Sequence, residues 1–291
     1  MSKRGKVQSV RWLLDKITNE NSGDHRTRYF YRGEAVTGSK LTPRLLRDEE
    51  KLEKYMKLYS CTTGCIIELQ HELLSRFRRY ASSQNIADSF NSTTGESPTL
   101  DEWLCIAQHH GLPTLLLDWS LHPLIGLYFS VRDTTKHSEP GRFWYLKLQE
   151  KAERSGYTVR LRDKSGEKNG ILLSEEPKIQ YGLFGKRKSD KNEHSERPRI
   201  IEHPRIIVPW VFNKRIEAQH ARFTYSGHLH IDKGLEEIED DKRPWTTLEW
   251  FEVPPERKPI IKNELEKLQI HEKTLFPDMD GLSRYLEGGG I

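Results

Sequence analysis

The sequence lacks the features of an exported, membrane-spanning or disulfide-stapled protein. No hydrophobic run approaches the roughly 20 residues needed to cross a bilayer. The N-terminal segment is basic and then amphipathic, without the apolar core or cleavage site of a signal peptide. The 291 residues include only 3 cysteines, an odd number that argues against a disulfide framework. We therefore expect a cytoplasmic protein with no membrane partner.

Metal ligands are also scarce. Cys61 and Cys65 have a spacing compatible with two ligands, but no second pair of cysteines or histidines follows at the distance of a structural zinc site. The simpler interpretation is that both thiols are buried or half-buried on a helix. We predict no metal cofactor.

No charge of one sign dominates the chain. The 47 Lys and Arg residues and the 43 Asp and Glu residues give a formal net charge of +4, without one dominant basic block. This mild positive charge would assist the approach of an anionic partner, so a nucleic-acid partner is allowed but not required. A hydrophobic content of 35% is enough to fill the core of a folded domain of this length.

Hydrophobic periodicity predicts a mixture of helices and strands. Helices are expected at about 9–19, in two pieces between 49 and 80, at about 99–111, after Pro123, and twice in the C-terminal tail. Strand-like runs cover 29–35, 114–119, 142–148, 205–212 and 222–231. Small polar residues from 82 to 98 predict a surface loop, and the mixed-charge run from Gln149 to Pro198 predicts an elaborated loop region. One α+β domain with helical additions is the simplest account.

The stretch QHHGLPTLLLDWS, from Gln108 to Ser120, joins a hydrophobic strand to polar residues at its ends. A buried strand explains the three leucines but not His109, His110, Asp118 and Ser120. Two interpretations stay open: the wall of an active site, or a polar cluster in which Asp118 caps the following helix. Adjacent helical residues point about 100° apart, so we expect only one of the two histidines to face a site.

An arginine stands in the middle of the strand-like run YRGE, a position that apolar residues normally fill. The rigid fork of donors of Arg32, beside the small Gly33, suits a phosphate or a ribose. The alternative is an internal salt bridge from Arg32 to an acid such as Glu34 or Asp118.

Six motifs together resemble, in order, those of the FRG domain family. They are YFYRGEA, LTPRLLR, ELLSRFRRYA, WLCIAQHHGLPTLLLDWSLHPLIGLYFSV, RIEAQHARFTYSG and LFPDMDGL. The family is named for the triplet that here reads Tyr31-Arg32-Gly33, and the resemblance runs from about residue 29 to 286. On this basis we expect an N-terminal helical extension over residues 1–28 and an FRG domain over 29–290, with a charged insertion at about 149–200.

The pattern of this family looks like a divergent ADP-ribosyltransferase arrangement. The resemblance implies one α+β domain with a central, mostly antiparallel split sheet flanked by helices, and NAD as the substrate. An arginine on the first core strand, a hydroxyl residue ending the second and a glutamate or glutamine on the third are matched here by Arg32, Ser120 and Gln219. The residues expected to bind NAD are Tyr31, Arg32, Gly33, His109 and Ser120, and those expected to carry the chemistry are Gln219, Asp118 and His110.

Two positions depart from the family pattern. Leu115 stands where an arginine usually follows GLPT, and the third motif offers Gln219, with Glu217 two residues before it, in place of a glutamate. The resemblance favours an NAD-dependent enzyme that modifies a nucleic acid or protein, in a bacterial defence, toxin or stress system. The departures favour the alternative, a non-catalytic module that binds a nucleotide or nucleic acid on the same fold.

A weaker alternative is a hydrolase that uses Cys105 or Ser120 with a histidine. Cys105 lies on the apolar stripe of its helix, and Ser120 lacks the G-x-S-x-G turn of such enzymes. An NAD-dependent enzyme should bring five side chains into one cleft that could hold a dinucleotide: Arg32, His110, Asp118, Ser120 and Gln219. A non-catalytic fold should instead show them hydrogen-bonded to one another with no cavity.

Overall fold

The computed structural model describes residues 3–20, 28–38, 40–59, 66–81, 98, 100–148, 158–160, 204–209, 214–226, 234–238 and 245–290. The expected loop at 82–98 and the charged insertion at about 149–200 fall almost entirely outside these residues, as do Cys61 and Cys65. No helix in the described part of the chain is both long and apolar enough to cross a membrane.

The described strands form one mixed sheet in the order β1-β8-β4-β2-β3-β7-β6-β5. Their bounds are β1 (Lys3–Lys6), β2 (Tyr29–Glu34), β3 (Leu116–Ser120), β4 (Gly141–Leu148), β5 (Thr158–Arg160), β6 (Arg205–Val208), β7 (Ala221–Tyr225) and β8 (Trp245–Val253). Every pairing is antiparallel except β1 with β8 and β5 with β6 at the two edges. The prediction of an α+β fold with a mostly antiparallel sheet is confirmed.

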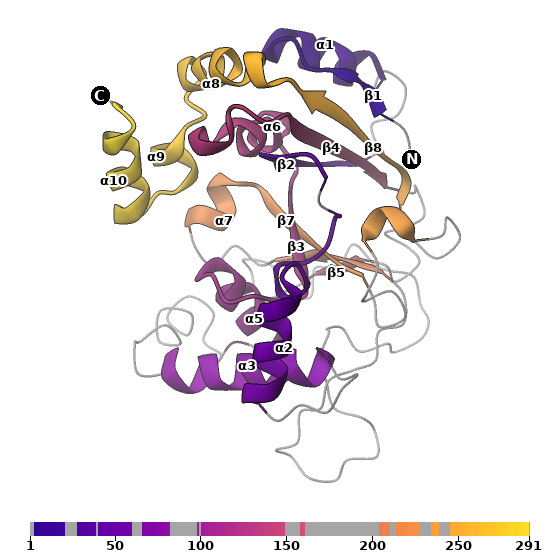
Figure 1. Cartoon of the computed structure of the whole chain (residues 1–291), viewed down its shortest axis with the longest axis vertical. Coiled ribbons are helices and arrows are strands. Elements are labelled where there is room, and N and C mark those ends of the chain that lie inside the picture. Colours follow the sequence, from indigo (N-terminus) through magenta and orange to yellow (C-terminus); the bar gives the residue numbers. More distant parts are fainter. Residues whose placement is uncertain are drawn as a thin grey trace.

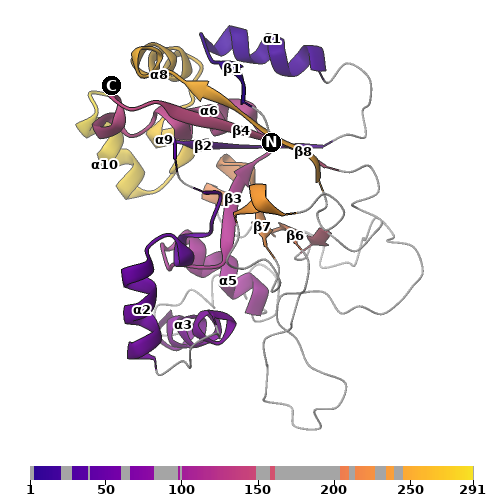
Figure 2. The same cartoon turned by 45° about the vertical axis from the view of Figure 1, so that its right-hand side comes forward.

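The sheet divides in its middle. β2 pairs with β4 along its whole length, but with β3 it shares the single registered pair Tyr31 and Ser120. Figures 1 and 2 show the consequence: β8, β4 and β2 run across the upper half of the molecule, whereas β3 and β7 run down and away from them. The two halves of the sheet therefore diverge from the point where Tyr31 meets Ser120.

Separate groups of helices cover the two halves of the sheet (Figure 1). The helices are α1 (Val10–Glu20), α2 (Glu49–Leu58), α3 (Ile66–Ala81), α5 (Leu100–His109), α6 (Pro123–Val131), α7 (Lys214–Ala218), α8 (Lys258–Lys267), α9 (Glu272–Leu275) and α10 (Met279–Glu287). One apolar cluster packs α1, α6 and α8 against β2, β4 and β8. Another packs α3 and α5 against β3 and β7. These two clusters each belong to one half of the sheet. A third cluster joins the halves, because it contains Phe30 of β2 and Trp144 of β4 together with Leu117 and Trp119 of β3.

The helix after β3 lies unusually close to the sheet. A Cβ atom on Gly33 of β2 would stand 2.1 Å from the backbone oxygen of Gly126 in α6, and one on Gly126 would stand 2.8 Å from Cβ of Tyr31. Only glycine allows this approach, because any side chain would overlap the facing backbone. Gly33 therefore serves helix packing.

The strand β8 was not expected from the sequence, although it is the longest strand described. Glu249 and Glu252 interrupt its hydrophobic run, and both form ion pairs with basic residues of the N-terminal segment, Glu249 with Arg4 and Glu252 with Lys3 and Lys6. The segment predicted as a helical extension thus contributes a strand to the sheet as well as the helix α1. The domain boundary at residue 28 stays a prediction.

Candidate functional site

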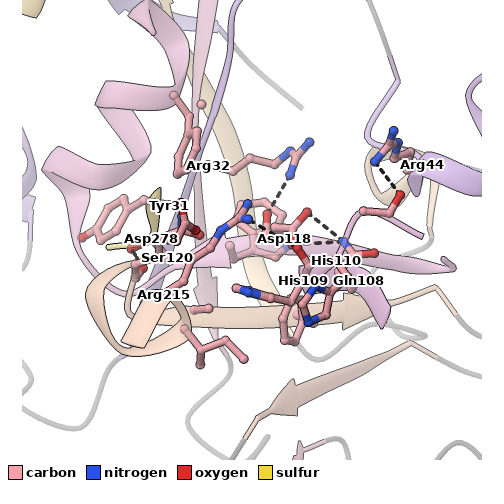
Figure 3. Close-up of a pocket in the computed structure, with 18 of the residues that line it drawn as sticks. Tyr31, Arg32, Arg44, Gln108, His109, His110, Asp118, Ser120, Arg215 and Asp278 are labelled. Atoms are coloured by element: carbon pink, nitrogen blue, oxygen red, sulfur yellow. Dashed lines mark hydrogen bonds between the residues drawn. The ribbon is translucent and has the colours of Figure 1, made fainter. Parts of the chain in front are cut away.

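A pocket of about 690 Å³ opens where the two halves of the sheet separate (Figure 3). This volume lies in the range of pockets that bind small molecules and cofactors. Every residue that the sequence assigned to a site lines it: Tyr31, Arg32, Gly33, His109, His110, Asp118, Ser120 and Gln219. The tertiary structure brings these residues together from β2, α5, β3 and the turns that follow α5 and α7, while the roles assigned to them stay predictions.

Asp118 is the one exposed residue in the otherwise buried strand β3. Its backbone oxygen accepts a hydrogen bond of 2.8 Å from Nη1 of Arg32. This bond links β3 to β2 next to their single registered pair. The two strands that diverge at the pocket are therefore held together by one of its lining residues.

The carboxylate of Asp118 is held by a chain of side chains from the preceding segment. Nε2 of Gln108, near the end of α5, donates to both Oδ1 and Oδ2 at 3.0 Å (Figure 3). The hydroxyl of the buried Thr114 donates to Oε1 of Gln108, which orients the amide with its NH₂ group toward the carboxylate. Each carboxylate oxygen has further lone pairs, so Asp118 keeps capacity for a ligand.

The alternative in which Asp118 caps the next helix is wrong. The N-cap of α6 is His122, whose Nδ1 accepts from the backbone N–H of Leu124 at 3.2 Å. The side chain of Asp118 points from the middle of a strand instead of from its end, so it cannot reach the first turn of α6.

An internal salt bridge is the alternative role that the sequence suggests for Arg32, and the structure contains one with Glu34. Its Nε lies 3.5 Å from Oε1 of Glu34, an ion pair whose geometry does not make a hydrogen bond. The other oxygen of Glu34 accepts from Nε1 of Trp144 at 2.8 Å. Arg32 therefore forms an ion pair with Glu34 and also lines the pocket.

Ser120 and Gln219 line the pocket but are committed to the protein. The hydroxyl of Ser120 donates to the backbone oxygen of Gln219 at 2.8 Å and accepts from the N–H of His122 at 3.0 Å. The amide of Gln219 donates to the backbone oxygen of Leu275 at 3.0 Å. These bonds join β3, α7 and α9 into one wall. The alternative of a hydrolase with Cys105 as nucleophile has no support, because Cys105 is only 1% exposed and its thiol is buried in the core.

Both histidines face the pocket, so the expectation that only one would do so is wrong. His109 is the last residue of α5 and His110 begins the following turn. Their rings meet edge to face at 4.9 Å. Burial, then the charges of Arg215 and His110, lowers the pKa of His109 to about 4, and desolvation also lowers the pKa of His110. Both imidazoles are neutral at pH 7.

The sequence reasoning missed three arginines and two aspartates of the pocket. They are Arg44, Arg47, Arg215, Asp278 and Asp280. All of them stand in the quoted motifs LTPRLLR, RIEAQHARF and LFPDMDGL, so the motifs were the signal that could have found them. Arg215 donates to the backbone oxygen of His109 at 3.3 Å and stacks on Phe276, with Cζ 4.6 Å from the ring centroid. Asp278 accepts from the N–H of Gly281 as the N-cap of α10.

One of the two positions that depart from the family pattern, Leu115, lies in the core. Leu115 is 2% exposed and packs among the residues of α3 and α5. Its N–H donates to Oε1 of Gln70 at 2.7 Å. Residue 115 therefore contributes to packing in this chain, and other arginines supply the positive charge of the pocket.

Four arginines and three aspartates line the pocket, which gives it a small positive formal charge because the histidines are neutral. Within the described residues, no group of three His, Cys, Asp or Glu side chains is placed to hold a metal ion. The arrangement is one that an anionic organic ligand fits, with arginines for its charge and Asp118 for its hydroxyl groups.

Comparison with known proteins gives one match. Residues 27–139 match the sequence model of the FRG domain. This range contains every predicted site residue except Gln219 and four of the six motifs, so the resemblance to the FRG domain is confirmed over this part of the chain. For RIEAQHARFTYSG and LFPDMDGL the resemblance stays a prediction. No curated protein and no solved structure matches the chain. The likeness to ADP-ribosyltransferases stays a prediction.

Proposed function

We propose that this chain, of which residues 27–139 match the FRG domain, binds NAD in its pocket and is an ADP-ribosyltransferase-like enzyme acting on a nucleic acid or protein. A bacterial defence or toxin system is its expected setting. The observation that carries the proposal is the convergence of Arg32, Asp118 and Gln219, which are far apart in the sequence, on one pocket large enough for a small-molecule cofactor.

The reaction that fits this pocket breaks the bond between nicotinamide and C1′ of the ribose. The bonding electron pair leaves with the nicotinamide nitrogen, and positive charge develops on the sugar as in glycoside hydrolysis. A carboxylate beside the ribose stabilises that charge in the transition state. Asp118 is the group for this role, because Gln108 fixes its carboxylate before the ligand arrives. The acceptor then forms the new bond to C1′ and loses its proton.

The neutral histidines supply a base for that proton. A neutral imidazole has one nitrogen that accepts a proton, and His110 is the more exposed of the pair. Arg32 would hold a phosphate or a ribose hydroxyl, as its rigid donors suit. Gln219 is assigned to the wall that positions the ribose, since its amide is already bonded to the backbone of Leu275.

A specific observation favours the second candidate, a module that binds a nucleotide without turnover. Ser120 and Gln219 match two of the three family positions, but their side chains donate hydrogen bonds to backbone oxygens of the protein itself. If no further group were supplied by the acceptor, the pocket would retain a nucleotide and leave the glycosidic bond intact.

The test follows NAD labelled on the adenylate in the presence of DNA, RNA or a protein extract. We expect nicotinamide release and transfer of label to one acceptor class. Asp118→Asn should lower the rate by about a hundredfold or more, the effect of losing a preorganised charge at the transition state. Asp15→Asn, on the exposed face of α1, is the matched control and should leave the rate unchanged.

The outcomes separate the two candidates. Turnover that Asp118→Asn abolishes, with NAD affinity preserved, establishes the enzyme. Binding of NAD or ADP-ribose without turnover in any mixture establishes the module. A folded protein that binds neither nucleotide contradicts both.

A further inference from the structure

Two arginines of the pocket come from a short turn to which the proposed reaction gives no role. Arg44 and Arg47 belong to the turn formed by the 3₁₀ helix η1 (Arg44–Leu46) and its C-cap. Residues three apart in a 3₁₀ turn lie above one another, so both side chains leave on the same side. Leu45, between them, is 2% exposed and anchors the turn in the core. The sequence RLLR thus turns both guanidinium groups toward the pocket.

Backbone carbonyls hold both guanidinium groups in place. Nη1 of Arg44 donates to the oxygen of Gly111 at 2.9 Å (Figure 3), and Nε of Arg47 donates to the oxygen of Thr42 at 2.9 Å. Gly111 has a φ of +85°, in the left-handed region that favours glycine. A guanidinium has five N–H donors, so these bonds orient each group and leave most of its donors for a ligand.

The two arginines differ from a surface arginine in their partners. Arg76 on α3 pairs with Glu72 at 2.6 Å, as exposed helical arginines commonly do. Among the residues that the structure describes, no carboxylate lies within ion-pair distance of Arg44 or Arg47. Within the described part of the chain, their positive charge is therefore not matched by a contacting acid.

The neighbouring charges increase this imbalance. Partial desolvation, and next the positive charge of Arg32, lowers the pKa of Arg47, with Arg44 acting in the same direction. Glu34 and Asp118 act in the opposite direction without pairing with it. Arg32, Arg44 and Arg47 line one pocket, and the charges of Arg32 and Arg44 both act unfavourably on Arg47. A bound anion would relieve that repulsion.

We propose that Arg44 and Arg47, with Arg32, form a subsite for the phosphate groups of a nucleoside diphosphate. The inference deepens the proposed function, because it requires the ligand to carry a diphosphate and sets the direction in which it lies. In Figure 3 Arg44 lies on one side of Asp118, and Asp278 and Arg215 lie on the other. The proposed diphosphate is therefore held on the Arg44 side, away from Asp278.

The experiment measures binding of ADP, adenosine and inorganic pyrophosphate to the full chain by calorimetry at two salt concentrations. We expect ADP and pyrophosphate to bind, adenosine to bind far more weakly, and ADP affinity to fall with salt as the charges are screened. Arg44→Gln and Arg47→Gln keep most of the apolar stem and should each weaken ADP binding by about tenfold or more, the effect of losing a charged hydrogen-bond donor. Arg76→Gln is the control and should bind ADP like the unchanged protein.

Several results would overturn the subsite. These are equal binding of ADP and adenosine, no binding of ADP or pyrophosphate by the folded chain, or the same effect from Arg44→Gln, Arg47→Gln and Arg76→Gln. Failure of the reaction is distinguishable from failure of the subsite. ADP binding that depends on Arg44 and Arg47, without NAD turnover, keeps the subsite and removes the enzyme, whereas NAD turnover that is indifferent to both arginines keeps the enzyme and removes the subsite.

Discussion

Two groups of side chains line the pocket and differ in what holds them. Gly33, Ser120 and Gln219 are committed to the protein, through close helix packing or through hydrogen bonds to backbone groups. Asp118, Arg44 and Arg47 are oriented by the protein but keep donors or acceptors that no protein group requires. A residue can therefore line the pocket without being available to bind a ligand. Variants of the first group should change stability, and those of the second should change binding.

The largest effect on stability is expected at Gly33. In Gly33→Ala the new methyl group would overlap the backbone of α6, which must then move away from β2. Overpacking of this kind costs about 1–3 kcal/mol, and we expect the upper end or more because the facing atoms are backbone. Chemical denaturation measures the loss. Gly288→Ala, whose Cβ would make ordinary contacts of 3.4 Å, is the control, and equal losses from both variants would contradict the packing role.

A smaller effect is expected at Ser120. Ser120→Ala removes the donor to the oxygen of Gln219 and the acceptor for the N–H of His122, so two backbone groups lose a partner. The free energy of unfolding should fall by about 1–3 kcal/mol, the cost of leaving a buried polar group unsatisfied. Asp118→Asn should have a clearly smaller effect in the same titration. A larger loss of unfolding free energy in Asp118→Asn than in Ser120→Ala would contradict the distinction between the two groups.

The effect that is smallest at neutral pH, because it develops only in acid, is a dependence of stability on pH through His109. Its pKa is lowered to about 4 in the folded state, mainly by burial, against an unfolded value near 6.5. The unfolded chain therefore binds a proton between these values while the folded chain does not, so this residue lowers stability as the pH falls from about 6.5 toward 4. His109→Gln should flatten the fall in melting temperature over that window. An unchanged slope would show that other groups carry it.

Much of the fold could be predicted because local periodicity is strong in the elements concerned. The paired helices α2 and α3, the proline at the start of α6 and the aromatic strand β2 follow from the sequence alone. The strand β8 could not be predicted in the same way, because its two glutamates mask the pattern. They are compatible with a strand only because basic residues of β1 lie beside them.

The candidate site was predictable in its membership but not in its division of roles. The motifs pointed to Asp118 and Arg32, since polar residues in a buried strand need an explanation. They could not separate Ser120, which is bonded within the wall, from Arg44 and Arg47, which are not paired with an acid. That separation depends on hydrogen bonds between segments far apart in the chain, which no local pattern contains.

The sequence by itself determined the α+β class, most of the elements and the residues that could serve an anionic ligand, because these depend on periodicity and on side-chain chemistry. The tertiary structure decided that β2 and β3 share only the pair Tyr31 and Ser120, that a pocket lies where they diverge, and that four arginines line it. These features depend on how β2, β3 and the turn at Arg44 pack together. Only the folded chain brings those segments within reach of one another.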